Sequence, residues 1–314
     1  MIGNFEDPRK TFGEEVCRIA LENRKIVLLS ADSGRSSGFG SFMDKCPERY
    51  FEFGIMEQTM TGAASGLAST GKIPVICAIA SFITARNYEM FRNDIGYMRQ
   101  NVKIVGRNGG ITYSDLGTTH HSLDDFGLIG MIPGVVVLAP QDPNEIREAV
   151  RAMLKYEGPV YMRIGNEKQE NLFESGFEIG KARHICHGED VTLISAGSMT
   201  ANAVKACRKL NERDISVEHL GISTLIPLDC DAILESAART GFVVTVEEHY
   251  TEGGLGNKVG ELLATEGCPA ELIKLAIPHD YCISGPYSEV LAYYELDADS
   301  IAARIEQDFK GVYF

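Results

Sequence analysis

Short apolar runs alternate along the chain with stretches whose apolar residues recur every three to four positions. The runs are rich in Val and Ile and too short for core helices, so they predict β-strands. They occupy residues 25–32, 73–82, 101–107, 135–140 and 159–165. Helical spacing predicts helices over 57–70, 85–99 and 143–155, the last with Asp142 as N-cap and Pro143 in the first turn. Apolar strands separated by helices indicate a parallel sheet with both faces covered.

The polar stretch 166–180 interrupts this pattern, and we interpret it as a linker between two domains. A second alternating series follows it. Its predicted strands and helices occupy residues 190–197, 199–213, 216–223, 232–240, 242–249, 254–267, 271–278 and 300–310. We therefore expect an α/β protein with two doubly wound domains, over residues 1–168 and 180–314, of which the second is smaller.

The composition narrows the classes of function. Of the 314 residues, 44% are hydrophobic and 24% charged, which is ordinary for a globular protein. The net charge of -14 argues against nucleic-acid binding, because an acidic surface repels phosphate backbones. The N-terminus shows no secretion signal and no stretch approaches about 18 apolar residues, so we expect a cytoplasmic protein without a membrane partner. The eight cysteines form no C-x-x-C pair, so neither a zinc site nor a disulfide framework is predicted.

The segment FEFGIMEQTMTGAASGLASTG, residues 51–71, carries the clearest candidate chemistry. Glu57 stands where an extended piece meets a helix of small residues. A carboxylate is favoured at a helix N-terminus, so Glu57 taken alone would be a simple cap. The small residues after it let another backbone or subunit approach closely, which would partly bury the carboxylate and suit it to a functional role.

This segment resembles the pyrimidine-binding domain of transketolases and of deoxyxylulose-phosphate synthase. The resemblance implies that Glu57 is catalytic: it hydrogen-bonds the aminopyrimidine ring of thiamine diphosphate and favours the imino tautomer that activates this cofactor. Phe82 matches the family aromatic that stacks on the pyrimidine, and Arg86 matches an arginine of the same pocket. The plain alternatives are a core aromatic for Phe82 and a solvated helix arginine for Arg86.

The loop SDLGTTHHSLDDFGLI, residues 114–129, matches the family a third time. It resembles the family sequence G-P-T-H-H, which implies that His120 binds substrate and helps to protonate its oxygens. His120 and His121 are poorly placed to share one metal, so we expect no metal site. Two departures put the usual pentose-phosphate substrates in doubt: Leu116 stands where many transketolases carry an aspartate that binds a substrate hydroxyl, and Asn108 stands where they carry a histidine.

Three further residues match family positions that hold an anionic substrate group. Arg9 precedes the first helix, Ser36 lies in the sequence ADSGRSSGF, and Arg163, in the sequence PVYMRIG, matches a family arginine after the last strand of the domain. Arginines suit this role because they bind phosphate oxygens in a bidentate manner. The plain alternative for each arginine is a solvated surface residue, so their joint occurrence carries the interpretation.

One element of transketolases has no counterpart in the sequence. The family binds the diphosphate through a metal held by a G-D-G…N motif, which this chain does not contain. The resemblance therefore implies an N-terminal partner subunit that carries the motif and binds Mg²⁺ or Ca²⁺, in an α2β2 assembly. We expect a two-subunit enzyme that transfers a two-carbon ketol unit from a ketose (phosphate) donor to an aldose acceptor. The alternatives are a deoxyxylulose-phosphate-synthase-like carboligase, an E1β-type subunit of a 2-oxo-acid dehydrogenase, and a non-catalytic subunit with the same fold.

Overall fold

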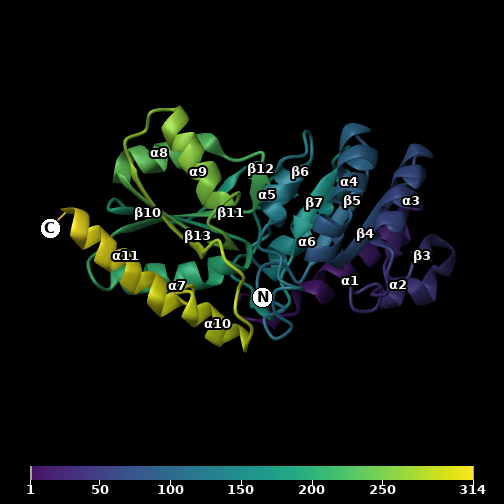
Figure 1. Ribbon diagram of the computed structural model, residues 1–314, viewed down its shortest axis with the longest axis horizontal. Helices are drawn as coiled ribbons and strands as arrows, with labels where there is room; N and C mark the ends of the chain where they lie inside the picture. Colours follow the sequence, from purple (N-terminus) through teal and green to yellow (C-terminus); the bar gives the residue numbers. More distant parts are fainter. Residues whose placement is uncertain (1, 314) are drawn as a thin grey trace.

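The computed structural model describes residues 2–313, which form two lobes, each built around a β-sheet (Figure 1). The strands are β1 (Phe5–Glu6), β2 (Ile26–Ser30), β3 (Tyr50–Glu52), β4 (Ile73–Ile79), β5 (Lys103–Arg107), β6 (Val136–Leu138), β7 (Val160–Arg163), β8 (Gln169–Glu170), β9 (Ala182–Cys186), β10 (Val191–Ala196), β11 (Val217–Ile222), β12 (Thr224–Ile226), β13 (Phe242–Tyr250) and β14 (Glu271–Ile277). The α-helices are α1 (Pro8–Glu22), α2 (Gly40–Lys45), α3 (Glu57–Ser69), α4 (Tyr88–Met90), α5 (Asp125–Gly130), α6 (Pro143–Lys155), α7 (Thr200–Asn211), α8 (Cys230–Thr240), α9 (Leu255–Thr265), α10 (Tyr287–Tyr293) and α11 (Ala298–Tyr313).

The two sheets are almost wholly parallel. The first has the strand order β12-β6-β7-β5-β4-β2-β3 and the second the order β14-β13-β10-β11-β9. The exceptions are β12 and β9, which pair antiparallel with β6 and β11. Central strands such as β2 and β5 are buried at every position, as expected where helices cover both faces of a sheet. The predicted class, a two-lobed α/β protein with parallel sheets, is confirmed.

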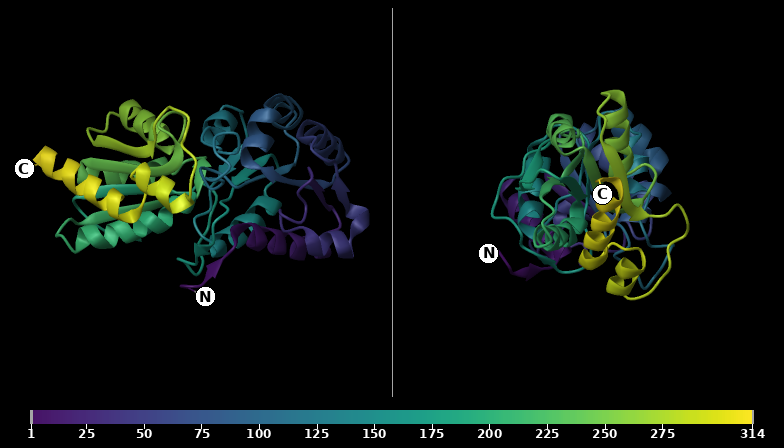
Figure 2. Two further views of the ribbon diagram at one scale, coloured as in Figure 1. Left: turned by 60° about the horizontal axis from the view of Figure 1, so that its bottom comes forward. Right: turned by 90° about the vertical axis from the view of Figure 1, so that its left-hand side faces the viewer.

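Helices cover both faces of each sheet (Figures 1 and 2). On the first sheet, α1, α2 and α6 bury one face through residues such as Phe12, Phe42 and Val150, which share one apolar cluster. On the second sheet, α7, α10 and α11 form a cluster of their own on one face. A third cluster includes Met60 of α3 and Val259 of α9, and so extends through both lobes.

The two lobes also share a strand. β12 follows β11 of the second sheet in the chain, yet it pairs with β6 of the first, with Thr224 opposite Leu138. The first sheet is therefore completed at one edge by the second half of the chain. Nothing in the apolar pattern indicated this exchange, because a strand of three residues leaves too short a period to recognise.

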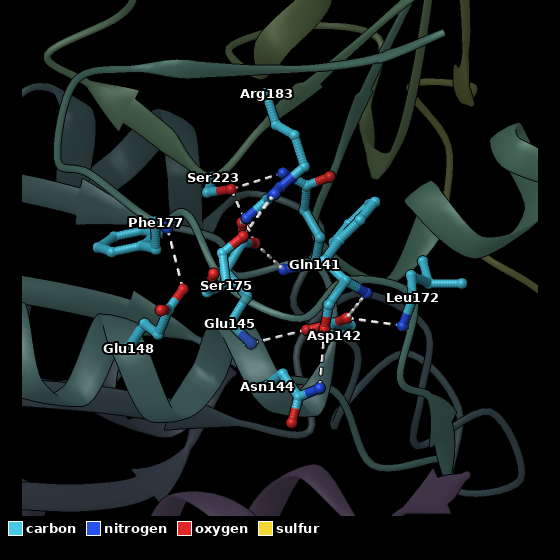
Figure 3. Close-up of polar contacts among 11 residues, drawn as sticks. Gln141, Asp142, Asn144, Glu145, Glu148, Leu172, Ser175, Phe177, Arg183 and Ser223 are labelled. Atoms are coloured by element: carbon cyan, nitrogen blue, oxygen red, sulfur yellow. Dashed lines mark hydrogen bonds and ion pairs between the residues drawn. The ribbon is translucent and has the colours of Figure 1, made fainter. Parts of the chain in front are cut away.

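The polar segment 166–180 is held firmly against the N-terminus of α6. Its strand β8 pairs with β1, and Asp142 accepts hydrogen bonds from its backbone (Figure 3). The Asp142 Oδ2 atom receives the amides of Leu172 and Phe173 at 2.7 and 2.8 Å, while Oδ1 receives the Glu145 amide at 2.6 Å. Asp142 is thus the predicted N-cap of α6, and it also fixes the segment between the lobes.

Glu145 extends this network into the second lobe (Figure 3). Its Oε2 atom accepts hydrogen bonds from the Gln141 amide at 2.7 Å and from the Ser223 hydroxyl at 2.8 Å. Its Oε1 atom lies 3.3 Å from an Arg183 nitrogen. Buried polar groups need such partners, so the network stabilises one relative placement of the two lobes.

The region after β4 differs from expectation. The sequence predicted a strand to residue 82, but β4 ends at Ile79, which pairs with Arg107, the last residue of β5. Without a neighbouring strand beyond that point, the chain turns into helix. Phe82–Arg86 and Phe91–Tyr97 are π-helical, with α4 between them. Phe82 therefore opens a helical segment and is not part of a strand.

Within residues 2–313, no helix is both long and apolar enough to cross a membrane.

Candidate active site

Glu57 is the first residue of α3, and its side chain is buried with only 3% of its surface exposed. It follows two exposed apolar residues, Ile55 and Met56. The N-terminus of the helix favours the negative charge of the carboxylate. A direct partner adds to this: Arg86 Nη1 donates a hydrogen bond of 2.8 Å to Glu57 Oε2. No donor among residues 2–313 reaches the other oxygen, Oε1, which leaves it able to accept a hydrogen bond from a ligand.

The π-helical turn Phe82–Arg86 brings two predicted residues together. The guanidinium carbon of Arg86 lies 4.1 Å from the centre of the Phe82 ring, a cation–π contact. The backbone carbonyl of Arg86 accepts a hydrogen bond of 3.1 Å from the side-chain amide of Gln58. Such turns widen the helix and change the direction of side chains, and they often occur at functional sites. Here the turn allows Arg86 to contact both Glu57 and Phe82.

His120 joins this group from a different loop. Its ring centre lies 5.2 Å from that of Phe82 and 5.7 Å from that of Tyr113. The Thr119 hydroxyl is 3.0 Å from His120 Nδ1, and the Ser81 hydroxyl donates to the His120 carbonyl at 3.3 Å. Hydrogen bonds on Nδ1 and on the backbone fix the orientation of the imidazole. Glu57, Arg86, Phe82 and His120 therefore form one continuous row of contacts.

Arg9 and Ser36 lie near the start of α1. Arg9 pairs with Asp7, the N-cap of that helix, through Nη2 at 2.8 Å, and this hydrogen bond raises the pKa of the guanidinium. Ser36 is exposed in the loop before Gly38. Gly38 packs against the backbone of α1, because a Cβ placed on Gly13 would come within 2.4 Å of the Gly38 Cα. Both predicted residues therefore belong to one corner of the first lobe.

Arg163 lies in a buried group of charged residues. It is buried, with Nη1 3.1 Å from Asp125 Oδ1, and Nη2 donates to the Glu248 carbonyl at 2.5 Å. It also packs against Gly109 and Gly110, which lead into the loop of His120. Burial opposes the charged guanidinium, but the two carboxylates raise the pKa of Arg163. This placement lets Arg163 support the loop of His120 from behind.

The two residues that departed from the family lie in different surroundings. Leu116 is 51% exposed in the loop that carries His120. Asn108 is buried just after β5 with a positive φ of 59°, and its side-chain oxygen accepts a hydrogen bond of 2.8 Å from Arg107 Nη1. Asparagine tolerates this left-handed backbone better than most residues, which gives Asn108 a local reason to be there.

Sequence reasoning missed several residues around this site. Tyr113 contacts His120 but lies just before the matched motif, so no pattern marked it. Asp125 and Glu248 hold Arg163, yet they lie 38 and 85 residues from it in the chain. The doubled aspartate in the sequence SLDD was the single visible signal for Asp125.

Comparison with known proteins agrees with this geometry. Residues 7–169 match the transketolase pyrimidine binding domain, and residues 180–301 match the transketolase C-terminal domain. The chain belongs to the transketolase family. A transketolase C-terminal section of Methanocaldococcus jannaschii is 37% identical over 98% of both chains. One of the subunits of apulose-4-phosphate transketolase from Phocaeicola vulgatus is 36% identical over 96% of this chain and 97% of its own length.

A solved transketolase structure is similar throughout. It is a split-gene transketolase described as an inactive β4 tetramer, with 34% identity and a TM-score of 0.89 over 97% of this chain and 98% of that one. Transketolases use thiamine diphosphate, and the residues here fit its pyrimidine ring. Glu57 offers a carboxylate oxygen, and Phe82 offers an aromatic ring that contacts the same arginine, Arg86.

Proposed function

We propose that this chain is one subunit of a two-subunit transketolase and binds the pyrimidine half of thiamine diphosphate. The observation that carries the proposal is the row formed by Glu57, Arg86, Phe82 and His120. Its supporting context is the similarity to a single subunit of apulose-4-phosphate transketolase and to a split-gene transketolase. The diphosphate and its Mg²⁺ or Ca²⁺ would be held by a partner with the G-D-G…N motif.

Each residue of the row has a distinct task in this proposal. Glu57 accepts a hydrogen bond from the pyrimidine through Oε1, while Arg86 keeps the carboxylate in place through Oε2. Phe82 offers its ring as a stacking surface, and His120 presents Nε2 to the substrate because its Nδ1 faces Thr119. Thiamine diphosphate, when bound, would supply the electron sink for transfer of the two-carbon unit. His120 holds a proton near the substrate oxygens.

The surface around Glu57 suits the approach of another subunit. Ile55 is 71% exposed and Met56 is 54% exposed directly beside the carboxylate. Further along α3, a Cβ placed on Gly66 would meet no atom within 4 Å, so the helix is also open at that position, on the side away from Glu57. Exposed apolar groups beside small residues favour close packing of a partner, and an α2β2 assembly would cover the surface around Glu57.

For the substrate, we propose a phosphorylated sugar that differs from the usual pentose and hexose phosphates near the reacting hydroxyl. Arg9, Ser36 and Arg163 would bind its anionic group. Arg163 also packs against the two glycines that lead into the loop of His120. Leu116 cannot accept the hydrogen bond that an aspartate would take from a substrate hydroxyl. Its exposure of 51% leaves it free to face a ligand.

The proposal is tested by reconstitution. The purified chain, given thiamine diphosphate, Mg²⁺ and sugar phosphates, should show no turnover above background. Adding the partner subunit should restore ketol transfer. Robust turnover by the chain alone would contradict the two-subunit hypothesis. Release of CO₂ from pyruvate with an aldehyde phosphate, without ketol transfer between sugars, would instead support a carboligase of the deoxyxylulose-phosphate-synthase type.

A further inference from the structure

Three polar side chains converge at the edge of the second sheet, outside the site described above. His184 Nδ1 lies 3.0 Å from Glu218 Oε1, and His187 Nδ1 lies 3.5 Å from Glu218 Oε2. One ligand atom from each of the three residues lies within 4.8 Å of the other two. The two imidazole rings stack with their centres 5.8 Å apart. Two ring nitrogens and one carboxylate in this arrangement are a donor set for a transition metal.

The backbone explains how these residues meet. His184 belongs to the edge strand β9, and Glu218 belongs to its neighbour β11. The pairing of the two strands shifts register between His219 and Leu220, which marks a β-bulge. As a result, His184 and Cys186 point to opposite faces, although residues two apart normally share one face. Cys186 lies near Asn211 and Cys207 of α7, away from Glu218.

The surroundings of Glu218 hold its carboxylate in a fixed position, as suits a metal ligand. Its side chain is 1% exposed, and its Oε1 lies 3.0 Å from His184 Nδ1. Gly188 N and Arg239 Nη2 both donate to Oε2, at 3.0 and 2.9 Å. These donors fix the carboxylate from one side, as the supporting groups of metal ligands do. Oε1 faces His184, and His187 lies beside Oε2.

The separations suit zinc geometry. Zinc binds histidine nitrogen and carboxylate oxygen at about 2.0–2.2 Å, so neighbouring ligands of a tetrahedral ion lie about 3.3–3.5 Å apart. The observed nitrogen–oxygen distances, 3.0 Å from His184 to Oε1 and 3.5 Å from His187 to Oε2, are close to these values. The His187 side chain is 84% exposed, so a fourth position would be open to water. A Mg²⁺ ion would not suit the site, because it prefers oxygen ligands in octahedral geometry.

We propose that His184, His187 and Glu218 form a binding site for Zn²⁺ or a similar divalent transition metal at the edge of the second lobe. The metal would join β9, the turn after it and β11, and so brace the exposed edge strand. This inference is independent of the proposed function, since it concerns a different lobe and a different metal. The simpler arrangement is a histidine hydrogen-bonded to a buried carboxylate, with no affinity for metal.

Metal titration of the full chain distinguishes the two arrangements. Calorimetry with Zn²⁺ should show one saturable site, and Co²⁺ should give visible absorption without a thiolate charge-transfer band. His184→Ala and His187→Ala should each weaken binding by about 10-fold or more. His279→Ala is the matched control, because His279 is an exposed histidine paired with one carboxylate, Glu252, at 3.7 Å. It should leave the affinity unchanged, and Mg²⁺ should not bind this site.

Thermal unfolding gives a second readout. Zn²⁺ should raise the Tm of the wild type and of His279→Ala, because it binds the folded state, but should not raise that of the His184→Ala/His187→Ala double variant. Circular dichroism of the double variant should match the wild type without metal. The proposal is wrong if no saturable binding occurs, if the double variant binds as tightly as the wild type, or if Co²⁺ reports thiolate ligands.

Discussion

Arg86 and Glu57, 29 residues apart in the chain, are joined by a hydrogen bond of 2.8 Å between Nη1 and Oε2. The carboxylate is 3% exposed and the arginine side chain 39% exposed, so the pair spans the boundary between interior and surface. The pair therefore aligns a buried carboxylate while leaving its second oxygen available. This alignment supports the proposal that Glu57 binds the cofactor, which began from the sequence motif around it.

Glu57→Gln should lower ketol transfer in the assembled enzyme by about 10²–10⁴-fold, because the amide keeps the shape but removes the proton-accepting charge. The measurement is the steady-state rate with the partner subunit, supported by thiazolium proton exchange. Glu89→Gln is the matched control, since Glu89 is an exposed carboxylate three residues beyond Arg86. Wild-type exchange rates in Glu57→Gln would remove Glu57 from the mechanism.

Leu116→Asp should shift substrate preference toward sugars that carry the hydroxyl which Leu116 cannot bind. A hydrogen bond to such a hydroxyl changes relative rates by roughly tenfold to a hundredfold, or about 1–3 kcal/mol. A panel of ketose phosphate donors and aldehyde acceptors would measure kcat/KM for both proteins. Leu21→Asp, at an exposed leucine of α1, should leave the ranking as it is. If xylulose 5-phosphate and ribose 5-phosphate are already the best pair for wild type, and Leu116→Asp does not change the order, the substrate hypothesis fails.

Asp142→Asn should loosen the segment between the lobes. The carboxylate accepts three backbone amides, and an amide side chain cannot satisfy them all. Each buried donor left without a partner costs about 1–3 kcal/mol. We expect a lower urea midpoint and faster proteolytic cleavage within residues 166–180. Glu174→Gln changes an exposed carboxylate of the same segment and should behave as wild type. Equal cleavage of both variants would show that Asp142 does not fix the segment.

The buried His219 is expected to lower the free energy of unfolding in acid. Burial lowers its pKa from 6.5 to about 3, and its Nε2 lies 2.8 Å from the Ser195 hydroxyl. Between these two values the unfolded chain binds one more proton than the folded chain, so stability falls as pH falls. From about pH 7 to about pH 5, His219 should remove about 2 kcal/mol from the free energy of unfolding.

Urea unfolding at both pH values tests this assignment. His219→Gln should lose less stability on acidification than wild type, because glutamine does not titrate. His279→Gln, which removes an exposed histidine, should lose as much as wild type. An unchanged pH dependence in His219→Gln would show that another buried group is responsible.

Local sequence was enough to find most residues of the row around Glu57. Glu57, Phe82 and His120 each stand in a motif read within a few neighbouring residues, and the structure brings all three together. The environment of Arg163 could not be read in this way. Its burial depends on Asp125 and Glu248, which a strand motif does not reveal. The sequence also did not predict the cluster of His184, His187 and Glu218. The cluster depends on a β-bulge after His184, which changes the side of the sheet that the following residues face.

The strand β12 has a consequence for how such a gene can be rearranged during evolution. A break in the coding sequence between residues 168 and 180 would leave β6 with an unpaired edge, because its neighbour comes from beyond the break. Unpaired strand edges favour aggregation, so the first fragment would tend to aggregate as soon as it is synthesised. Recombination that exchanged the second lobe for a foreign one would also have to supply a matching strand. The two lobes are therefore expected to be inherited as one unit.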